Sequence, residues 1–334
     1  MNPTAKCDIK YTIIIPVKAI NDYMRETIPH IRDFQRDDWE LIILPNGPDT
    51  DEWHDPRISI IPSGRVGPAE KRNIGAQYAN GDILVFLDDD SYPESDLLDI
   101  AEQYFADENV VALGGPAVTP PDDTFWQRVS GAVFLSKFSG GIPERYIPVG
   151  KVRPVDDWPS VNLMVRRDVF LAIGGFSSSY WPGEDTKLCL DLIRKAGKQI
   201  LYIPEMRVWH HRRSGFAAHL RQVGAYGLHR GHFARKYPQT SCKLLYFLPS
   251  VFVLFVVFSV MIALTNSSGL GWLFVAGWIV YGLALTKAWV DISRYETASY
   301  IALMAIVYTI SSHFWYGLRF IQGFVTPKLV SRLR

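Results

Sequence analysis

The sequence predicts an α/β protein whose mostly parallel sheet is followed by membrane-spanning helices. Short, continuously apolar runs alternate with helical patterns over the N-terminal two thirds of the chain, which is typical of a parallel sheet covered on both faces. One of these runs ends in three consecutive aspartates, Asp88-Asp89-Asp90. The last third contains long stretches without any charged residue, as membrane-spanning helices do.

Strands and helices alternate in the order that such a sheet requires. Predicted strands lie at 11–17, 40–44, 58–61, 83–87 and 160–165. Predicted helices lie at 22–34, 68–79, 166–173 and 188–196, and glycines end the last two. Residues 114–160 are rich in glycine and proline, which predicts loops and short elements beside the sheet, a suitable place for recognising an acceptor.

The carboxyl ends of the predicted strands indicate where a ligand would bind. Pro16 and Val17 end the first strand, Asn46 follows the second, and the three aspartates follow the strand at 83–87. Ligands of open α/β sheets bind outside these ends. The sequence contains no G-x-G-x-x-G or Walker A motif, so neither standard phosphate-binding loop is expected.

The three aspartates predict a site for a divalent cation. Adjacent carboxylates repel one another, and Mg²⁺ or Mn²⁺ relieves this repulsion through oxygen ligands while keeping positions open for phosphate. In an extended segment Asp88 and Asp90 point to one side and Asp89 to the other, so Asp88 and Asp90 form the expected ligand pair. The alternative is a solvated acidic turn before a helix that starts near residues 93–95.

The overall composition argues against two classes of protein. Lysine and arginine total 35 against 34 acidic residues, which gives no signature of nucleic-acid binding, so no nucleic-acid partner is expected. The three cysteines, Cys7, Cys189 and Cys242, are widely separated and lack the spacing of metal ligands. A disulfide framework is therefore not expected.

Charge-free stretches predict a membrane domain at 244–320, which would make this a multi-pass protein that contacts membrane lipids. Each stretch has the roughly 20 residues needed to cross a bilayer. The expected helices lie at about 244–264, 270–290 and 298–318.

The charges flanking this domain predict its orientation. The segment 206–243 carries eight basic residues and no acidic residue, which places residues 1–240 on the cytoplasmic side of the cell membrane. Three spans would then place the tail at 321–334 outside, although the tail contains Lys328, Arg332 and Arg334. Either the third apolar segment is re-entrant or interfacial, or the basic tail is exported against the positive-inside rule.

A second pair of carboxylates, Glu184 and Asp185, precedes the predicted helix at 188–196. The helix dipole stabilises a carboxylate at a helix N-terminus, so one interpretation of this pair is a simple N-cap. The same position would hold a general base rigidly at the mouth of a cleft. Taken alone, these residues leave both interpretations open.

Several short motifs follow one another along the chain: TIIIPV at 12–17, KRNIG at 71–75, FLDDD at 86–90, NLMVRR at 162–167, GGF at 174–176 and GED at 183–185. Their order and spacing resemble family 2 glycosyltransferases with the GT-A fold. With the C-terminal helices, the chain resembles the membrane-anchored members that act on bacterial exopolysaccharides and lipid-linked glycans. The resemblance implies a GT-A domain at 1–240 that transfers a sugar from a nucleotide-sugar donor to a lipid-linked or glycan acceptor.

The resemblance also implies the residues that bind the donor. Asp88 and Asp90 would hold Mn²⁺ or Mg²⁺ against the donor diphosphate, and a third ligand would be His210 or the adjacent His211. Further donor-binding residues would lie at the strand ends and on the helix at 68–79: Pro16, Val17, Asn46, Arg72, Asp88 and Asp89.

The catalytic roles implied by the resemblance fall on the second carboxylate pair. Asp185 would remove the proton from the acceptor hydroxyl as this hydroxyl attacks the anomeric carbon. Glu184 would help to orient the acceptor. One positioned base without a nucleophilic partner is typical of a single displacement with inversion.

Two departures from the family pattern affect specificity. Processive relatives carry Gln-x-x-Arg-Trp, whereas here Gln222 is followed by no Arg-Trp pair, which favours the addition of one or a few sugars. Relatives commonly end the second strand with two aspartates, whereas Pro45 and Asn46 stand here. Pro45 cannot supply the carboxylate hydrogen bond, so the donor nucleotide stays open between UDP, GDP and another base.

Two other functions are compatible with parts of the pattern. A nucleotidyltransferase would need a glycine-rich loop after the first strand, and residues 16–21 are not glycine-rich. A non-catalytic membrane scaffold could retain the sugar-nucleotide fold without turnover. The presence of both acidic clusters favours the enzyme over the scaffold.

Overall fold

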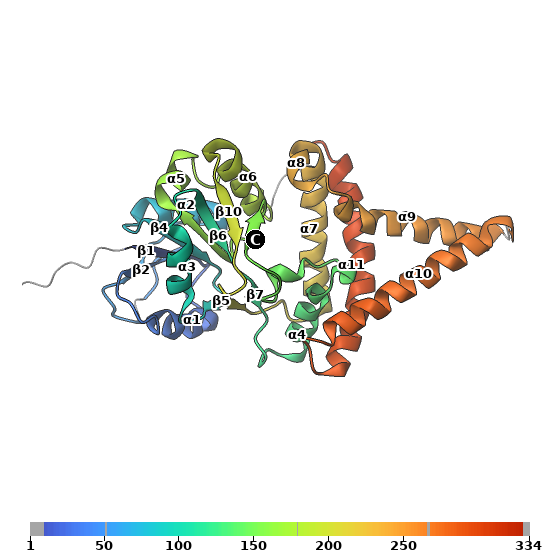
Figure 1. Cartoon of the computed structure of the whole chain (residues 1–334), viewed down its shortest axis with the longest axis horizontal. Coiled ribbons are helices and arrows are strands. Elements are labelled where there is room, and N and C mark those ends of the chain that lie inside the picture. The colour runs from blue at the N-terminus through green and yellow to red at the C-terminus, as the bar shows by residue number, and fades with distance from the viewer. Residues whose placement is uncertain (1–9, 51, 179, 266–267, 330–334) are drawn as a thin grey trace, which may run out of the picture. The chain divides into compact units, whose positions relative to one another are not determined.

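The computed structural model describes residues 10–50, 52–178, 180–265 and 268–329 (Figure 1). Their internal contacts divide them into two compact units. We call residues 10–118 and 147–210 the sheet unit, and residues 119–146 and 211–329 the helical unit. The expected boundary at residue 240 follows the composition, whereas the contacts group residues 211–240 with the C-terminal helices.

The sheet unit contains a mixed sheet with the strand order β3-β2-β1-β4-β9-β6-β10-β8. Within the described residues, all of its strands run in one direction except β8 and β9. The predicted α/β class is therefore confirmed. The strands are β1 (Tyr11–Pro16), β2 (Trp39–Leu44), β3 (Ile58–Ile60), β4 (Ile83–Leu87), β6 (Val110–Gly114), β8 (Arg153–Val155), β9 (Asn162–Arg166) and β10 (Gln199–Tyr202).

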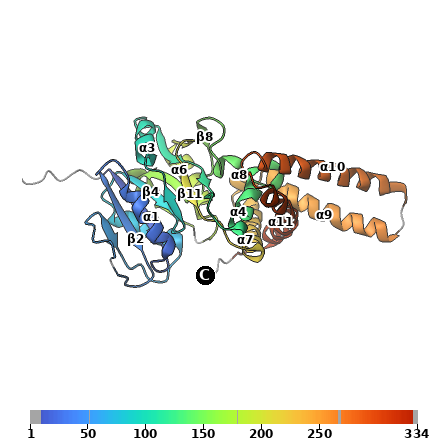
Figure 2. The same cartoon turned by 90° about the horizontal axis from the view of Figure 1, so that it is seen from below.

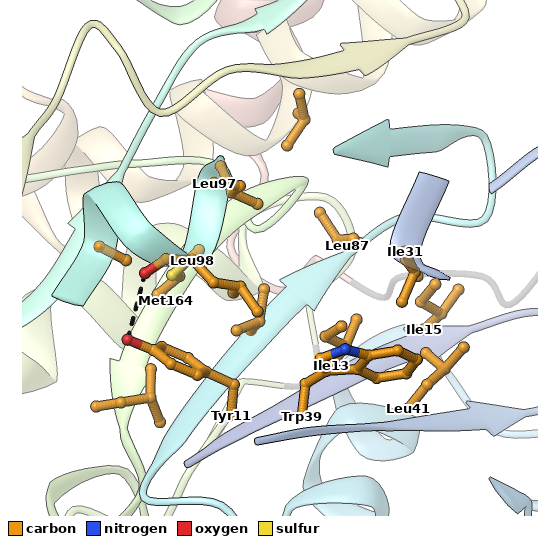
Figure 3. Packing of buried hydrophobic residues seen from close by; sticks show 14 of the residues in the cluster. Tyr11, Ile13, Ile15, Ile31, Trp39, Leu41, Leu87, Leu97, Leu98 and Met164 are labelled. Carbon is orange, nitrogen blue, oxygen red and sulfur yellow. Dashed lines mark hydrogen bonds between the residues drawn. The ribbon is translucent and has the colours of Figure 1, made fainter. Parts of the chain in front are cut away.

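Alternate residues of the central strands face two separate layers of the core. Ile13 and Ile15 of β1 pack in one apolar cluster, whereas Ile14 packs in another. Figure 3 shows part of the first cluster, in which the Tyr11 hydroxyl donates a hydrogen bond of 3.4 Å to the Leu98 carbonyl. Both faces of the sheet are thus buried, which explains why its strands are continuously apolar.

Helices supply the other half of each layer. The first cluster includes apolar residues of α1 (Asp22–Arg32) and α3 (Leu97–Phe105). The second includes residues of α2 (Pro68–Tyr78), α5 (Arg167–Ala172) and α6 (Glu184–Ala196). The helices α2 and α6 carry the polar residues of the candidate site, so the packing of the second layer also positions that site.

A smaller sheet brings a distant segment next to the aspartates. Its strands have the order β5-β11-β7, with the bounds Ser91–Pro93, Val208–His210 and Ala117–Val118. Strands β11 and β5 are antiparallel, and His210 pairs with Ser91. This register places the end of β11 beside the residue that follows Asp90.

The region rich in glycine and proline contains a helix that the sequence analysis did not predict. Helix α4 (Phe125–Ala132) begins at a capping box formed by Thr124 and Gln127, and 3-10 turns follow at Val133–Leu135, Lys137–Ser139 and Pro143–Arg145. The pattern Thr-x-x-Gln is a recognisable helix start, so this helix could have been found.

The helical unit contains the helices with membrane-like composition. Among the described residues, three helical segments are long and apolar enough to cross a membrane: Leu244–Thr265, Gly271–Ile292 and Ser299–Val325. Its helices after α4 are α7 (Phe216–Lys236), α8 (Pro238–Ser241), α9 (Leu244–Thr265), α10 (Ser268–Ile292) and α11 (Ser299–Val325). In Figures 1 and 2, α9 and α10 run side by side as a hairpin.

A buried histidine links three helices of this unit. His219 of α7 lies with Nδ1 2.8 Å from the Ser130 hydroxyl of α4 and with Nε2 2.9 Å from the Ser312 hydroxyl of α11. Burial lowers the pKa of His219 to about 4, from an ordinary value of 6.5. The imidazole is therefore neutral in the folded protein at pH values where an exposed histidine is already protonated.

This shift predicts acid sensitivity of the detergent-purified protein. Between pH 6.5 and about 4 the unfolded chain binds a proton at His219 that the folded chain rejects, so the free energy of unfolding should fall as the pH falls through this window. Thermal unfolding of wild type and His219→Gln across these pH values tests this. The stability of His219→Gln should depend less on pH than that of wild type. The control His54→Asn, at an exposed histidine, should follow wild type. If the stability of His219→Gln changed with pH in parallel with wild type, the assignment to His219 would be wrong.

Candidate functional site

Three predicted metal ligands converge at the ends of β4 and β11. Asp88, Asp90 and His210 each offer a ligand atom, and these atoms all lie within 4.8 Å of one another. Nε2 of His210 is 3.1 Å from Oδ1 of Asp90, which is only 6% exposed. Two carboxylates and one imidazole are a donor set that suits Mn²⁺, and a buried carboxylate favours a positive neighbour. The three side chains therefore fit a divalent cation.

The structure also separates the two adjacent histidines. His211 belongs to the helical unit, where its Nδ1 is 2.5 Å from Oδ1 of Asp123. Side chains of successive residues in a strand point to opposite sides, so the pairing of β11 with β5 directs only one of the two toward Asp90. His210 is thus the histidine of the candidate metal centre.

Asp88 and Asp90 come together for a different reason from the one predicted. The segment is a turn rather than an extended strand: the amide of Ser91 donates to the carbonyl of Asp88 at 3.2 Å, and the Ser91 hydroxyl lies 3.1 Å from the Asp88 amide. Asp89 turns toward the loop after β1, where it accepts a hydrogen bond of 2.8 Å from Asn21. The two side chains of the expected pair therefore lie close together, although the expected alternation along a strand is wrong.

Arg72 connects the two acidic clusters. Its Nη2 donates to Oδ1 of Asp88 at 2.5 Å, and its Nη1 is 3.7 Å from Oε1 of Glu184. The side chain is 2% exposed, and neither its Nε nor its Nη1 has a hydrogen-bond partner among the described residues. A buried guanidinium with unused donors between two carboxylates is suited to an additional anionic or hydroxyl-rich ligand.

The second carboxylate pair begins α6, but it does not cap this helix. The N-cap is Gly183, whose φ of 116° falls in the left-handed region that favours glycine, and it makes no side-chain hydrogen bond to the helix. Glu184 is buried, while Asp185 is half-buried and accepts from the Thr186 amide at 2.7 Å. The N-cap interpretation of this pair is therefore wrong.

The environment of Glu184 disfavours its charged form. Burial raises the pKa of Glu184, the negative charge of Asp185 raises it further, and Arg72 opposes both effects. Oε2 of Glu184 has no hydrogen-bond partner among the described residues. This carboxyl group is therefore poised for a polar ligand beside the more accessible Asp185.

A buried lysine that the sequence analysis did not select holds the strand ends together. Nζ of Lys71 donates to the Val17 carbonyl at 2.6 Å, to the Leu44 carbonyl at 2.9 Å and to Oδ1 of Asn46 at 2.8 Å. Burial lowers the pKa of Lys71 to about 8, and the charge of Asp89 opposes this shift. The position of Lys71 next to Arg72 on α2 was the one feature of the sequence that could have suggested a place for Lys71 in the site.

The remaining predicted donor-binding residues lie at these strand ends. The side chains of Pro16 and Val17 are buried, and Val17 belongs to the core cluster that contains α1. Asn46 is partly exposed, and its side-chain oxygen is fixed by Lys71. The buried side chains of Pro16 and Val17 do not face a ligand, and the amide and carbonyl of Val17 are hydrogen-bonded to Leu44 and Lys71. Asn46 still offers its side-chain amide.

Comparison with known proteins identifies the class of this fold and site. Residues 12–173 match the family model of Glycosyl transferase family 2. The structure is similar to the mannosyltransferase PcManGT from Pyrobaculum calidifontis, solved in complex with GDP-Man and Mn²⁺, with a TM-score of 0.57 and 19% identity over 91% of this chain and 85% of that chain. The fold is thus that of the GT-A glycosyltransferases.

Curated relatives point to the same class. The chain is 25% identical over 246 residues to a pre-mycofactocin glycosyltransferase of Mycobacterium tuberculosis, covering 70% of this chain and 49% of the relative. It is 26% identical over 154 residues to a glucosyl-dolichyl phosphate glucuronosyltransferase of Haloferax volcanii, covering 43% and 47%. The chain spans about half the length of these relatives. It carries a family 2 glycosyltransferase domain, and the predicted resemblance is confirmed.

Proposed function

We propose that this protein transfers a sugar from a nucleotide-sugar donor to a hydroxyl group of an acceptor, with inversion at the anomeric carbon. The observation that carries this proposal is the arrangement around Arg72, which joins the candidate metal ligand Asp88 to Glu184. This arrangement supports one site in which Asp88 would bind the cation of the diphosphate and the pair Glu184 and Asp185 would bind the acceptor.

The residues divide the chemistry between the two clusters. Asp88, Asp90 and His210 would hold Mn²⁺ or Mg²⁺, which when bound would offset the charge that develops on the departing nucleoside diphosphate. Asp185 would accept the proton of the attacking hydroxyl, and an ordinary aspartate suffices because this hydroxyl becomes acidic as the new bond forms. Glu184 would orient the acceptor through Oε2, which has no hydrogen-bond partner within the part of the chain that the structure describes.

The donor side of the site would be formed by the ends of β1 and β2. The side-chain amide of Asn46 would be available to a nucleotide, and Lys71 fixes its position. Pro16 and Val17 would shape the end of β1, because the Val17 amide already donates to the Leu44 carbonyl and its carbonyl accepts from Lys71. Asp89 would contact the donor from the turn after β4. No carboxylate stands at Pro45, so the base could be uracil, guanine or another.

A lipid-linked acceptor is supported by the helical unit. A membrane-bound enzyme meets a lipid-linked substrate at a raised effective concentration. Arg212 of this unit lies over the ring of the half-buried Tyr146, 5.0 Å from its centroid. Burial raises the pKa of the Tyr146 hydroxyl, and the charges of Arg212, Arg145 and Arg230 oppose this. Such a group of guanidinium side chains suits a phosphate-bearing acceptor. A curated relative is named for a dolichyl phosphate acceptor, which is consistent with this class.

The basic segment 206–243 supports a cytoplasmic position for the transferase domain. Positively charged flanks of membrane helices stay on the cytoplasmic side and are attracted to anionic headgroups. The protein would then work at the cytoplasmic face of the cell membrane, as a multi-pass protein whose active site faces nucleotide sugars.

Ligand-dependent stabilisation tests the donor site. One nucleoside diphosphate should stabilise the purified protein in the presence of Mn²⁺ and raise its unfolding temperature. At a ligand concentration of 100 times Kd, the free energy of unfolding should rise by about 2.7 kcal/mol. Asp90→Ala should abolish this shift, because it removes a ligand of the candidate metal centre, whereas Asp82→Ala, an exposed aspartate before β4, should retain it. Folded protein that responds to no nucleotide would refute the proposal and favour the scaffold.

A further inference from the structure

Helix α7 lies along the second half of α11 and runs parallel to it. A Cβ atom added to Gly227 or Gly231 of α7 would lie 2.6 Å from the Tyr316 carbonyl oxygen or 2.1 Å from that of Phe320, so glycine is needed for this close approach. Near the end of both helices, Nη1 of Arg235 donates to the Phe324 carbonyl at 2.9 Å. Figures 1 and 2 show the two helices side by side.

The first half of α11 is lined by a different segment, Thr119–Tyr146. An apolar cluster joins residues of α4 and the following turn to α11: Val129, Ala132, Val133, Ile301, Ala302, Ala305 and Tyr308. The aromatic rings of Phe125 and Tyr300 stack at 5.8 Å. This segment leaves the sheet unit after Val118 and re-enters it at Ile147, so both of its ends are tied to that unit along the chain.

The packing of α7 and of the segment Thr119–Tyr146 on α11 is incompatible with an α11 that crosses the bilayer. α11 has 27 residues and a length of about 40 Å, which exceeds the hydrocarbon thickness of about 30 Å. A spanning α11 would carry one of its halves to the far side, together with the segment packed on it. If the second half crossed, α7 would carry Arg221, Arg230, Arg235 and Lys236 into or across the membrane. If the first half crossed, the segment 119–146 would have to cross the membrane twice with its own charges. Both are costly in hydrocarbon.

An exposed apolar stripe runs along most of α11, up to Leu318. Residues at a spacing of three or four form a stripe, and each is at least 40% exposed: Tyr300, Leu303, Val307, Ile310, Phe314 and Leu318. An amphipathic helix with such a stripe and with basic residues beside it lies in the interface, with its apolar face in the boundary between headgroups and acyl chains. Here Arg235 of α7 contacts α11 at the Phe324 carbonyl, and α11 itself carries Arg319.

The hairpin of α9 and α10 starts and ends at this helix. Near the start of α9, the Ser250 hydroxyl donates to the Gly317 carbonyl at 3.1 Å. At the end of α10, Oδ2 of Asp291 accepts from the Ser136 hydroxyl at 3.0 Å, in the segment that lines α11. In Figures 1 and 2, the hairpin extends away from α7 and α11. Both ends of the hairpin therefore return to one side.

We infer that α11 lies in the membrane interface with its apolar stripe against the lipid, and that α9 and α10 cross the bilayer as a two-helix hairpin. The chain after Thr326 then stays on the side of α7. This topology removes the conflict between three spans and the basic tail, because two spans return the tail to the side of the basic segment 206–243.

Thiol labelling with a membrane-impermeant maleimide tests the topology of the full chain. With Cys7 and Cys189 replaced by serine, the exposed Cys242 between α8 and α9 marks the near side. In a Cys242→Ser background, Lys328→Cys should be labelled from the same side as Cys242, and Thr265→Cys at the end of α9 from the opposite side. Labelling of Lys328→Cys from the side of Thr265→Cys would overturn the inference. Labelling reports topology independently of transferase activity.

The depth of nitroxide labels in vesicles of phosphatidylcholine and phosphatidylglycerol gives a second test. Labels at Tyr300, Ile310 and Leu318 should have similar, shallow depths, because an interfacial helix is parallel to the membrane plane. Leu248 and Val257 on α9 are matched controls, exposed on a spanning helix, and Val257 should be the deeper of the two. A label at Ile310 that lies deeper than those at both Tyr300 and Leu318 would show a spanning α11 and refute the interfacial position.

Discussion

Asp185→Asn should lower the rate of sugar transfer by about 10²–10⁴-fold, the usual contribution of a positioned general base. Asparagine keeps the size of the side chain and can still accept the hydrogen bond from the Thr186 amide, but it cannot take up a proton. The Mn²⁺-dependent binding of nucleotide should be unchanged, because Asp185 is not among the candidate metal ligands. Single-turnover transfer assays and nucleotide titrations measure the two effects separately.

The exposed Asp168 at the start of α5 provides the matched control for this substitution. It also begins a helix and accepts a hydrogen bond, from the Val169 amide at 2.7 Å, so Asp168→Asn repeats the chemical change outside the site. Its transfer rate should equal that of wild type. An Asp185→Asn enzyme with full activity would assign the base to another residue, whereas a variant that loses nucleotide binding would point to a structural role.

Arg72→Met should lower the free energy of unfolding by about 1–3 kcal/mol, the cost of leaving a buried polar group without its partner. Arg72 is 2% exposed, and its removal takes the hydrogen-bond donor from Asp88, which is 34% exposed, and the neighbouring cation from Glu184, whose charged form burial already disfavours. Denaturant or thermal unfolding of the purified protein measures this loss. Donor binding should weaken as well, because Asp88 loses the side chain that orients it.

A double substitution distinguishes a buried charge from simple loss of packing. Adding Glu184→Gln to Arg72→Met neutralises the unpaired carboxyl group and should recover part of the stability, with a coupling energy of about 0.5–3 kcal/mol. If the stability loss of the double variant equalled the sum of the losses of the two single variants, the interaction of Arg72 with Glu184 would be excluded as the cause of the loss. Arg25, which is 47% exposed and pairs with the exposed carboxylates of Asp22 and Glu52, is the control. Arg25→Met should leave the free energy of unfolding close to that of wild type, because exposed ion pairs contribute little.

The parts of the fold that could be predicted are those that depend on local pattern. Continuously apolar runs located the central strands, and the acidic residues after β4 and before α6 marked both ends of the site. The reason given for pairing Asp88 with Asp90 was wrong, because the chain turns directly after Leu87 and the pairing arises from that turn.

The parts that could not be predicted depend on segments that are distant in the sequence. Lys71 is buried because the ends of β1 and β2 supply three oxygen acceptors, and the position of Lys71 next to Arg72 in the sequence does not reveal those acceptors. His210 is distinguished from His211 only by the register between β11 and β5. The bridge from Arg72 to Glu184 likewise exists only after α2 and α6 pack on the same face of the sheet.

The division of the chain has a consequence for its biosynthesis. The segment Thr119–Tyr146 interrupts the sheet unit, yet Val129, Ala132 and Val133 pack against α11, which is synthesised long after them. Domains generally fold as units during translation, beginning at the N-terminus. Here the apolar side of α4 stays exposed until the residues beyond 299 have been synthesised. A protein truncated at residue 240 would keep that surface permanently uncovered, so the transferase domain and its C-terminal helices have to mature together.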